Sequence, residues 1–246
     1  MREMKKLIWT AACLLCSVMI SAQSAWRVTP EAGLVVNKEN EGTRVALGFK
    51  AGVGVSYQMK EAVGYKPAFG LRSGLFVLQQ KGDYHPMAWG AIPTGDGFRL
   101  ESSSTAATRY YLQLPVMAQW SFRLCDDVAL HLAVGPYVAV GIAGKAEALL
   151  FSSKYLPEAD KAGQNPYEYR YDHIEFNPFE GKPVNDEFSM EGTTRFDWGG
   201  TASAGITVKR VSFNIGYDMA WGQFLKEQND LRIRNHMVSF TFGYTL

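Results

Sequence analysis

The chain has 246 residues, a formal net charge of +1 and 20% charged side chains, with a mean hydropathy of −0.13. A net charge so close to zero gives no reason to expect nucleic acid as a partner. Aromatic residues make up 13% of the chain and 24 residues are glycine, a composition that favours strands and turns over helices.

The first 22 residues have a pattern of their own. Arg2, Lys5 and Lys6 precede an apolar run over residues 7–20, and Ser21 and Ala22 supply small residues after it. This order is typical of a cleaved secretory signal peptide. The alternative is a membrane anchor, but the apolar run is shorter than the ~20 residues of a spanning helix. We therefore predict a signal peptide at residues 1–22 and a mature domain at residues 23–246.

From residue 26 onward the hydrophobic pattern has a period of two, which indicates β-strands. One face of each segment carries bulky apolar side chains, and the other carries Gly, Ala, Ser, Thr and scattered charges. Eight segments follow this pattern, at residues 26–36, 45–59, 67–79, 110–122, 128–144, 194–208, 211–221 and 236–246. We expect strands of about 10–15 residues, which are longer than the ~5–6 residues usual in soluble sheets.

The small polar face distinguishes a barrel from a soluble sandwich. A sandwich would direct long charged side chains outward, whereas a narrow barrel turns its bulky residues to lipid and its small residues to the lumen. Short connections also alternate with long ones, as they do in outer-membrane barrels. The sequence predicts an all-β fold: an eight-stranded antiparallel up-and-down transmembrane β-barrel of the outer membrane of a Gram-negative bacterium. In its fourth strand, Pro115 lacks an amide hydrogen, so we expect a bulge or a local break in pairing there.

Five charged residues fall on the polar faces of the predicted strands. We interpret them as a neutralising network that fills the lumen, because eight strands leave an interior just wide enough for side chains. The alternative is an ion pathway, or a narrow pore for small solutes. The five residues are Glu31, Lys50, Arg72, Asp197 and Asp218.

The sequence gives no support for a catalytic or metal site. His131 faces the lumen, where we expect no serine on a suitable face beside it, and His236 and Ser239 fall on opposite faces of one strand. A Ser-His-acid site therefore lacks its geometry. No zinc-ligand spacing or phosphate-binding glycine loop occurs. We expect no enzyme activity, cofactor or metal, and an enzyme acting on membrane lipid is the less favoured alternative.

The longest connection, at residues 145–192, is the most promising functional surface. The alternation YEYRY predicts that strands five and six continue above the membrane as a hairpin. Two interpretations of the loop stand side by side. It is a docking surface for a protein, a glycan or a secretion component, or it is a solvated loop that shields the barrel mouth. Its candidate contact residues are Tyr167, Tyr169, Tyr171, Phe176 and Phe179.

Three stretches, GFKAGVGVSYQ, YYLQLPVMAQWSF and SFTFGYTL, together resemble the PorT-like outer-membrane β-barrel domain. Tyr111 to Pro115 match the Tyr-Leu-x-(Leu/Ile)-Pro segment of that family. The resemblance implies a barrel in outer-membrane lipid, with envelope or secretion proteins as partners. The C-terminal alternation also resembles the signal read by the outer-membrane insertion machinery, through Phe240, Phe242, Tyr244 and Leu246.

Overall fold

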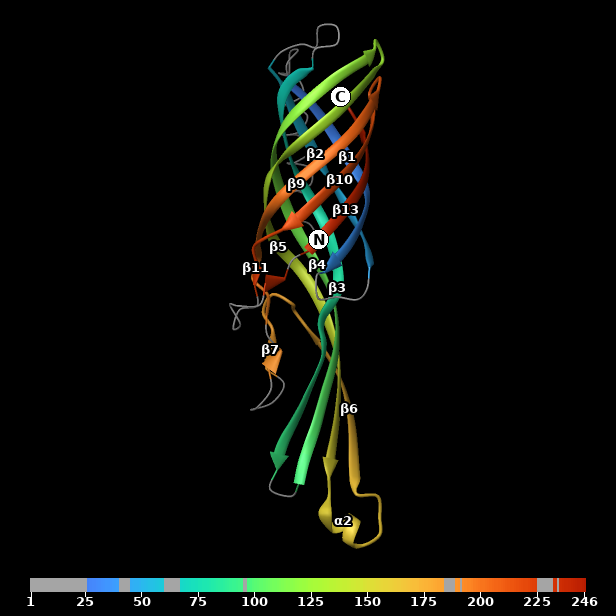
Figure 1. Cartoon of the computed structure of the whole chain (residues 1–246), viewed down its shortest axis with the longest axis vertical. Helices are drawn as coiled ribbons and strands as arrows, with labels where there is room; N and C mark the ends of the chain where they lie inside the picture. The colour runs from blue at the N-terminus through green and yellow to red at the C-terminus, as the bar shows by residue number, and fades with distance from the viewer. Residues whose placement is uncertain are drawn as a thin grey trace, which may run out of the picture.

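The structure is a computed structural model that describes residues 26–39, 45–59, 67–94, 97–183, 189–190, 192–224, 232–233 and 235–246. The predicted signal peptide lies outside these residues. Eight strands form the wall of a barrel (Figure 1). They are β1 (Trp26–Glu39), β2 (Ala46–Gln58), β3 (Ala68–Thr94), β4 (Gly97–Cys125), β5 (Val128–Tyr155), β9 (Phe196–Val208), β10 (Val211–Ala220) and β13 (Asn235–Tyr244).

The sheet closes on itself. Each of the eight strands pairs antiparallel with its two neighbours, β1 with β13 at one junction and β4 with β5 at another. The predicted eight-stranded antiparallel barrel is therefore confirmed. Closure leaves no wall strand with an unpaired edge, which a lipid environment requires.

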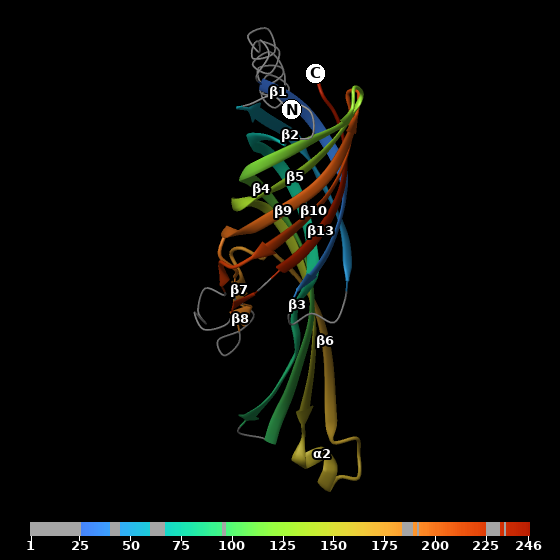
Figure 2. The same cartoon turned by 45° about the horizontal axis from the view of Figure 1, so that its top comes forward.

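The two ends of the barrel differ. At one end, residues 126–127 and 209–210 form the links between β4 and β5 and between β9 and β10, and the C-terminus lies nearby. At the other end, long hairpins extend beyond the wall (Figures 1 and 2). In the predicted orientation, the first is the periplasmic end and the second is the outer end.

The outer extension is a sheet continuous with the barrel. β6 (Tyr167–Phe176) pairs with β5 from Ala146 to Tyr155, and the short helix α2 (Pro157–Lys161) lies at the tip. The predicted hairpin of residues YEYRY is present, although β6 is not a wall strand. Four short strands complete the described chain: β7 (Lys182–Pro183), β8 (Ser189–Met190), β11 (Gln223–Phe224) and β12 (Arg232–Ile233).

Residues 80–108, which we expected to be one of the long connections because they lie between the third and fourth predicted strands, do not form a loop. β3 continues to Thr94, β4 begins at Gly97, and the two remain paired over this stretch. As a result β3, β4 and β5 have 27, 29 and 28 residues, about twice the expected length. Beyond the membrane a strand needs no lipid-facing apolar side, so the alternation that reveals a spanning strand does not extend there.

The wall has apolar residues outside and polar residues inside. On β4, Leu114, Val116 and Trp120 are exposed, whereas Tyr111 and Gln113 are buried. The other wall strands follow the same rule, and buried polar residues outnumber large buried apolar ones in the lumen. This arrangement is the inverse of a soluble sheet protein and suits a barrel whose outer face contacts lipid.

Pro115 does not form a bulge. The register of β4 with β5 is the same on both sides of it, whereas pairing with β3 passes from Val116 directly to Gln113. Ser73 of β3 donates its hydroxyl to the Pro115 carbonyl at 2.7 Å. The local break in pairing is therefore present and the bulge is not. Proline has no amide hydrogen to donate to the ladder, and the Ser73 hydroxyl bonds to the Pro115 carbonyl at this interruption.

Candidate functional site

The first part of the candidate site is a pair of charges in the lumen. Arg72 of β3 donates from Nη2 to Oε1 of Glu31 on β1 at 2.6 Å. Thr241 of β13 donates to the other carboxylate oxygen at 3.3 Å, and Arg72 Nη1 donates to Asn214 Oδ1 of β10 at 3.4 Å. A Cβ on Gly54 would lie 2.7 Å from Glu31 Oε1, so the glycine leaves room for the carboxylate.

Asp218 of β10 is the second acidic centre of the lumen. Lys50 Nζ lies 3.3 Å from Asp218 Oδ2, and Gln113 Nε2 donates to the same oxygen at 3.2 Å. The Thr201 hydroxyl donates to Asp218 Oδ1. Four of the five predicted lumen residues thus form two ion pairs, with hydrogen bonds to the remaining carboxylate oxygens. Such partners are needed because an uncompensated charge in this interior would be costly.

Asp197 does not join these ion pairs. It is fully buried on β9 and accepts a hydrogen bond from Tyr137 Oη at 3.3 Å. Its Oδ1 has no hydrogen-bond partner among the residues that the structure describes. Asp197 lies further toward the outer end of β9 than Thr201, which contacts Asp218. Arg109 of β4, also fully buried, is a further lumen cation, beyond the five charged residues predicted there.

A turn from Asn177 to Gly181 lies over the outer mouth. Asn177 Oδ1 accepts from the amide of Phe179 at 3.1 Å, and the Asn177 carbonyl accepts from the amides of Glu180 and Gly181, both at 3.0 Å. Gly181 has φ of 73°, a conformation that favours glycine. The local sequence Asn-Pro-Phe-Glu-Gly therefore specifies this turn through its asparagine, proline and glycine.

The turn places Phe179 inside the barrel. Its ring meets Tyr111 edge to face, with centroids 5.6 Å apart, and a Cβ on Gly141 would collide with it. The Arg195 guanidinium lies 5.2 Å from the ring centroid and 2.9 Å from Glu180 Oε1. Phe179 completes a buried cluster with Val35, Leu78, Tyr111, Tyr137, Ala139 and Met237. An apolar layer therefore fills the lumen above the two ion pairs.

Phe176 and Phe179 are not the exposed contact residues that we expected. Phe176 is 8% exposed and Phe179 is 0% exposed, because the chain turns back to the barrel after β6. The turn sequence at residues 177–181 is the signal that could have separated these phenylalanines from the tyrosines. Tyr167, Tyr169 and Tyr171 are exposed, the last at 76%.

The three tyrosines are part of a larger group of aromatic residues on the β5–β6 hairpin. Tyr167 and Tyr169 are stacked with centroids 6.2 Å apart. Across the hairpin, the ring centroid of Phe151 of β5 lies 6.1 Å from that of Tyr169 and 5.1 Å from that of Tyr171. The ring centroids of Tyr155 and Tyr167 are 5.6 Å apart. We call these five residues the aromatic row. Mutual stacking holds the rings in place while leaving their outer surface accessible.

A shift in register explains why the row faces outward. Tyr110 pairs with Ala143 and Tyr111 pairs with Gly141, so Ile142 is an extra residue in β5. Such a bulge reverses which alternate residues face outward. Before it the even-numbered residues of β5 face the lipid, and after it odd-numbered residues such as Phe151 lie on the outer side.

Charged residues separate the aromatic row from the apolar wall. Lys145 Nζ lies 2.8 Å from Glu147 Oε1 and 2.9 Å from Glu175 Oε1. These hydrogen bonds raise the pKa of Lys145, and the bond from Lys145 lowers the pKa of Glu147. Solvent exposure of all three groups keeps the contribution to stability small.

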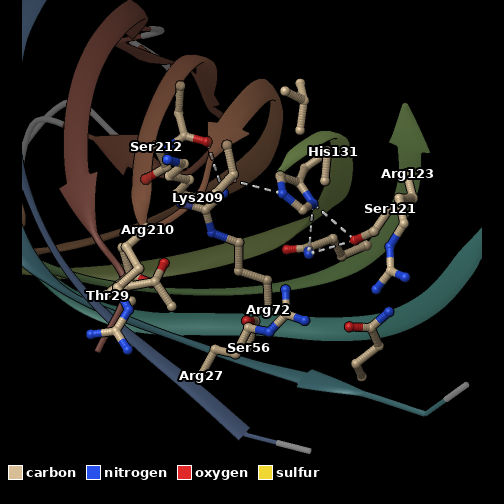
Figure 3. Close-up of a pocket in the computed structure, with 18 of the residues that line it drawn as sticks. Arg27, Thr29, Ser56, Arg72, Ser121, Arg123, His131, Lys209, Arg210 and Ser212 are labelled. Carbon is tan, nitrogen blue, oxygen red and sulfur yellow. Dashed lines mark hydrogen bonds between the residues drawn. The ribbon is translucent and has the colours of Figure 1, made fainter. Parts of the chain in front are cut away.

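At the periplasmic end, the structure corrects our expectation for His131. Ser121 of β4 pairs directly with His131 of β5, and their side chains meet with 2.9 Å between Oγ and Nδ1 (Figure 3). Thr207 Oγ1 lies 2.9 Å from Nε2 on the other side of the ring. A serine is therefore within reach, and pairing the strands across the link at residues 126–127 would have located it. The second nitrogen faces a hydroxyl rather than the carboxylate of a catalytic triad.

His236 has a different environment. Its Nδ1 lies 2.8 Å from Tyr217 Oη on the exposed side of the wall, near the outer end. Ser239 is buried on the other face of β13. The predicted separation of His236 and Ser239 is therefore present.

The residues of the predicted insertion signal all face outward. Phe240, Phe242, Tyr244 and Leu246 are exposed, with Phe242 at 64%, while Thr241 between them is buried. Phe213 of β10 packs on Phe242 with ring centroids 5.1 Å apart. This strand therefore presents a continuous apolar and aromatic stripe to lipid.

Within the described part of the chain, no group of three or more His, Cys, Asp or Glu residues could hold a metal ion. None of the described helices has the length and hydropathy of a transmembrane segment.

A closed antiparallel barrel with an apolar exterior and a hydrogen-bonded polar lumen defines a transmembrane β-barrel of the outer-membrane type. Residues 21–225 match the family model described as outer membrane protein beta-barrel domain. The chain belongs to this family and is a protein of the outer membrane of Gram-negative bacteria.

Similarity to individual proteins is low. No curated protein matches the sequence. Among solved structures, the chain is similar to that of Ail, the attachment invasion locus protein of Yersinia pestis, in complex with the heparin analogue sucrose octasulfate. The two sequences are 10% identical, the match covers 91% of this chain and 100% of that chain, and the TM-score is 0.38. The chain is also similar to the structure of Neisserial surface protein A. The two sequences are 14% identical, the match covers 91% of this chain and 98% of that chain, and the TM-score is 0.34.

Proposed function

We propose that the protein is a non-catalytic outer-membrane barrel that holds a docking platform for an envelope or secreted protein outside the cell. The single observation that carries this proposal is the aromatic row on the β5–β6 hairpin, where Tyr171 is 76% exposed. Tyrosine is enriched at protein interfaces because it offers a large, rigid contact surface with a polar tip.

The edge of the hairpin indicates what kind of partner fits. Among the described residues, β6 pairs with β5 along one edge and with no strand along the other. Such an edge offers backbone donors and acceptors to an added strand. We infer that the partner is a protein that lays an extended segment along β6. The resemblance to the PorT-like family supports an exported protein as that partner.

Two other functions are weaker. A pore for small solutes would require an open lumen, and the apolar layer around Phe179 and the two ion pairs below it argue against one. An enzyme acting on membrane lipid would need an activated nucleophile. Ser121 and His131 are in contact, but Thr207 stands where a triad has its acid. The charges of the lumen therefore have a structural role in this proposal.

The hairpin can be removed without disturbing the lumen. Leu149 pairs with His173, so residues 150–172 can be replaced by Asn-Gly, which forms a two-residue hairpin turn. This change retains Phe176 and Phe179. We expect normal heat-modifiable migration of the barrel. We also expect that the partner protein, identified in the unmodified chain by a photoreactive residue at Arg170, no longer co-purifies with this variant.

A matched control keeps the hairpin and changes its tip. In Lys161→Gln, which lies in α2, cross-linking through Arg170 should be unchanged. A double substitution, Tyr169→Ser with Tyr171→Ser, should reduce cross-linking while the barrel still assembles. Undiminished capture of the same protein by the double variant, through a photoreactive residue at Arg170, would contradict the docking role of the aromatic row.

A further inference from the structure

The lumen contains a pocket at its periplasmic end. Its volume is about 370 Å³, and it lies below the Glu31–Arg72 pair. Basic side chains enter it from several strands and from the link at residues 209–210 (Figure 3). They are Arg27, Arg72, Arg123, Lys209 and Arg210. A volume of this size is in the range of small-molecule sites.

The pocket has an excess of positive charge. Arg72 is neutralised by Glu31 at 2.6 Å, which leaves Arg27, Arg123, Lys209 and Arg210 facing two acidic residues of the rim, Asp126 and Asp127. None of these four cations forms an ion pair within the residues that the structure describes. Arg123 lies on one side of the pocket, and Arg27 and Arg210 lie on the other (Figure 3). A cleft with an excess of one sign of charge concentrates counter-ions.

A buried hydroxyl gives an independent indication of a ligand. Ser212 lines the pocket and is only 6% exposed, yet its Oγ has no hydrogen-bond partner among the described residues. Buried polar groups are normally paired, and an unpaired one costs stability. Ser56 and Gln119 also line the pocket and supply further polar groups.

We propose that this pocket binds a phosphorylated polyol. The guanidinium groups of Arg27 and Arg123 match phosphate oxygens in geometry and charge, and the Ser212 hydroxyl and the Gln119 amide suit the hydroxyl groups of a polyol. The same chemistry occurs in a free periplasmic metabolite and in the glycerophosphate headgroup of a lipid in the inner leaflet. The pocket lies at the periplasmic end of the barrel, and this proposal does not depend on the docking platform at the outer end.

The first test uses the whole mature barrel in a maltoside detergent. Calorimetric titration with glycerol 3-phosphate should show binding that weakens as salt rises, and glycerol should not bind. The double variant Arg27→Gln with Arg123→Gln should bind about tenfold more weakly or worse, since it loses two charge-assisted contacts. Lys161→Gln, which removes one positive charge at the far end of the molecule, should bind normally.

Ser212→Ala separates ligand binding from folding. It should weaken glycerol 3-phosphate binding several-fold while the thermal midpoint stays the same or rises, because the change removes an unpaired buried hydroxyl. A merely structural serine would leave the affinity unchanged. This variant keeps the proposal testable if the arginine variant assembles poorly.

A lipid arm distinguishes the two sources of phosphate. The barrel is reconstituted in phosphatidylcholine vesicles with or without phosphatidylglycerol and then titrated with glycerol 3-phosphate. If a lipid headgroup is the occupant, phosphatidylglycerol should block the titration, and if a free metabolite is the occupant it should not. Absence of binding in both detergent and vesicles, or equal binding by the arginine variant, overturns the proposal.

Discussion

Phe179 and Tyr111 meet edge to face inside the outer mouth of the barrel, with ring centroids 5.6 Å apart. One ring comes from a connection that follows the outer hairpin and the other from a wall strand, and both are fully buried. The connection between β5 and β9 therefore has two parts with different roles. Its first part extends the hairpin away from the membrane, and its second part returns to fill the lumen.

Removing the Phe179 ring tests the second role. Phe179→Ala should destabilise the barrel by about 3–5 kcal/mol, because it leaves a cavity in a packed layer. The measurement is the temperature at which the heat-modifiable band shifts to the unfolded position. Tyr171→Ala, which truncates an exposed ring, should leave that temperature unchanged. Equal behaviour of the two variants would contradict the buried position of Phe179.

The ion pair of Glu31 and Arg72 gives a second prediction. Glu31→Gln should cost about 3–5 kcal/mol, since it leaves the Arg72 guanidinium without its counter-charge in a confined interior. The double variant Glu31→Gln with Arg72→Met should recover part of this loss, which chemical denaturation of the four proteins of a double-mutant cycle would measure. Strictly additive losses would show that the two groups are not coupled.

The outward stripe of β13 gives a third prediction. Phe242→Asp should impair membrane insertion, because a charge on the lipid face costs up to about a few kcal/mol near mid-bilayer. The measurement is the fraction of protein that is heat-modifiable in purified outer membranes. Phe242→Leu is the matched control and should insert normally. Full insertion of the aspartate variant would refute the role of Phe242 in the insertion signal.

The leader of the chain gives a fourth prediction. If residues 1–22 are a signal peptide, protein purified from the outer membrane should begin at Gln23 by mass spectrometry. Cleavage removes three basic residues and one acidic residue, Glu3, and so changes the formal net charge from +1 to −1. Replacing Ala22 by a bulky residue should leave the precursor uncut. An intact N-terminus in the membrane fraction would favour the anchor instead.

Conductance separates the closed lumen from the pore alternative. The purified protein in a planar bilayer should give no steady open-channel current, because the apolar layer and the two ion pairs occupy the lumen in succession. Phe179→Ala should also stay closed, since the Lys50–Asp218 and Glu31–Arg72 pairs remain below it. A large, steady current from the unmodified protein would contradict the proposal.

The sequence by itself determined the class of fold. Alternation of bulky and small residues is imposed by two different surroundings, lipid outside and a crowded lumen inside, so it can be recognised along each spanning strand. The same alternation predicts the outward stripe from Phe240 to Leu246. It also predicts which strand faces carry Glu31, Lys50, Arg72 and Asp218, because these residues lie on spanning strands.

Only the tertiary structure decided which residues on those faces meet. Register pairs Ser121 with His131 and places Asp218 opposite Thr201 rather than opposite Asp197. A one-residue bulge at Ile142 turns the aromatic row outward. The position of Phe179 depends on the return of the chain after β6. Periodicity describes the side of a strand that a residue occupies, whereas its height and its partners follow from strand pairing, which brings together residues distant in the chain.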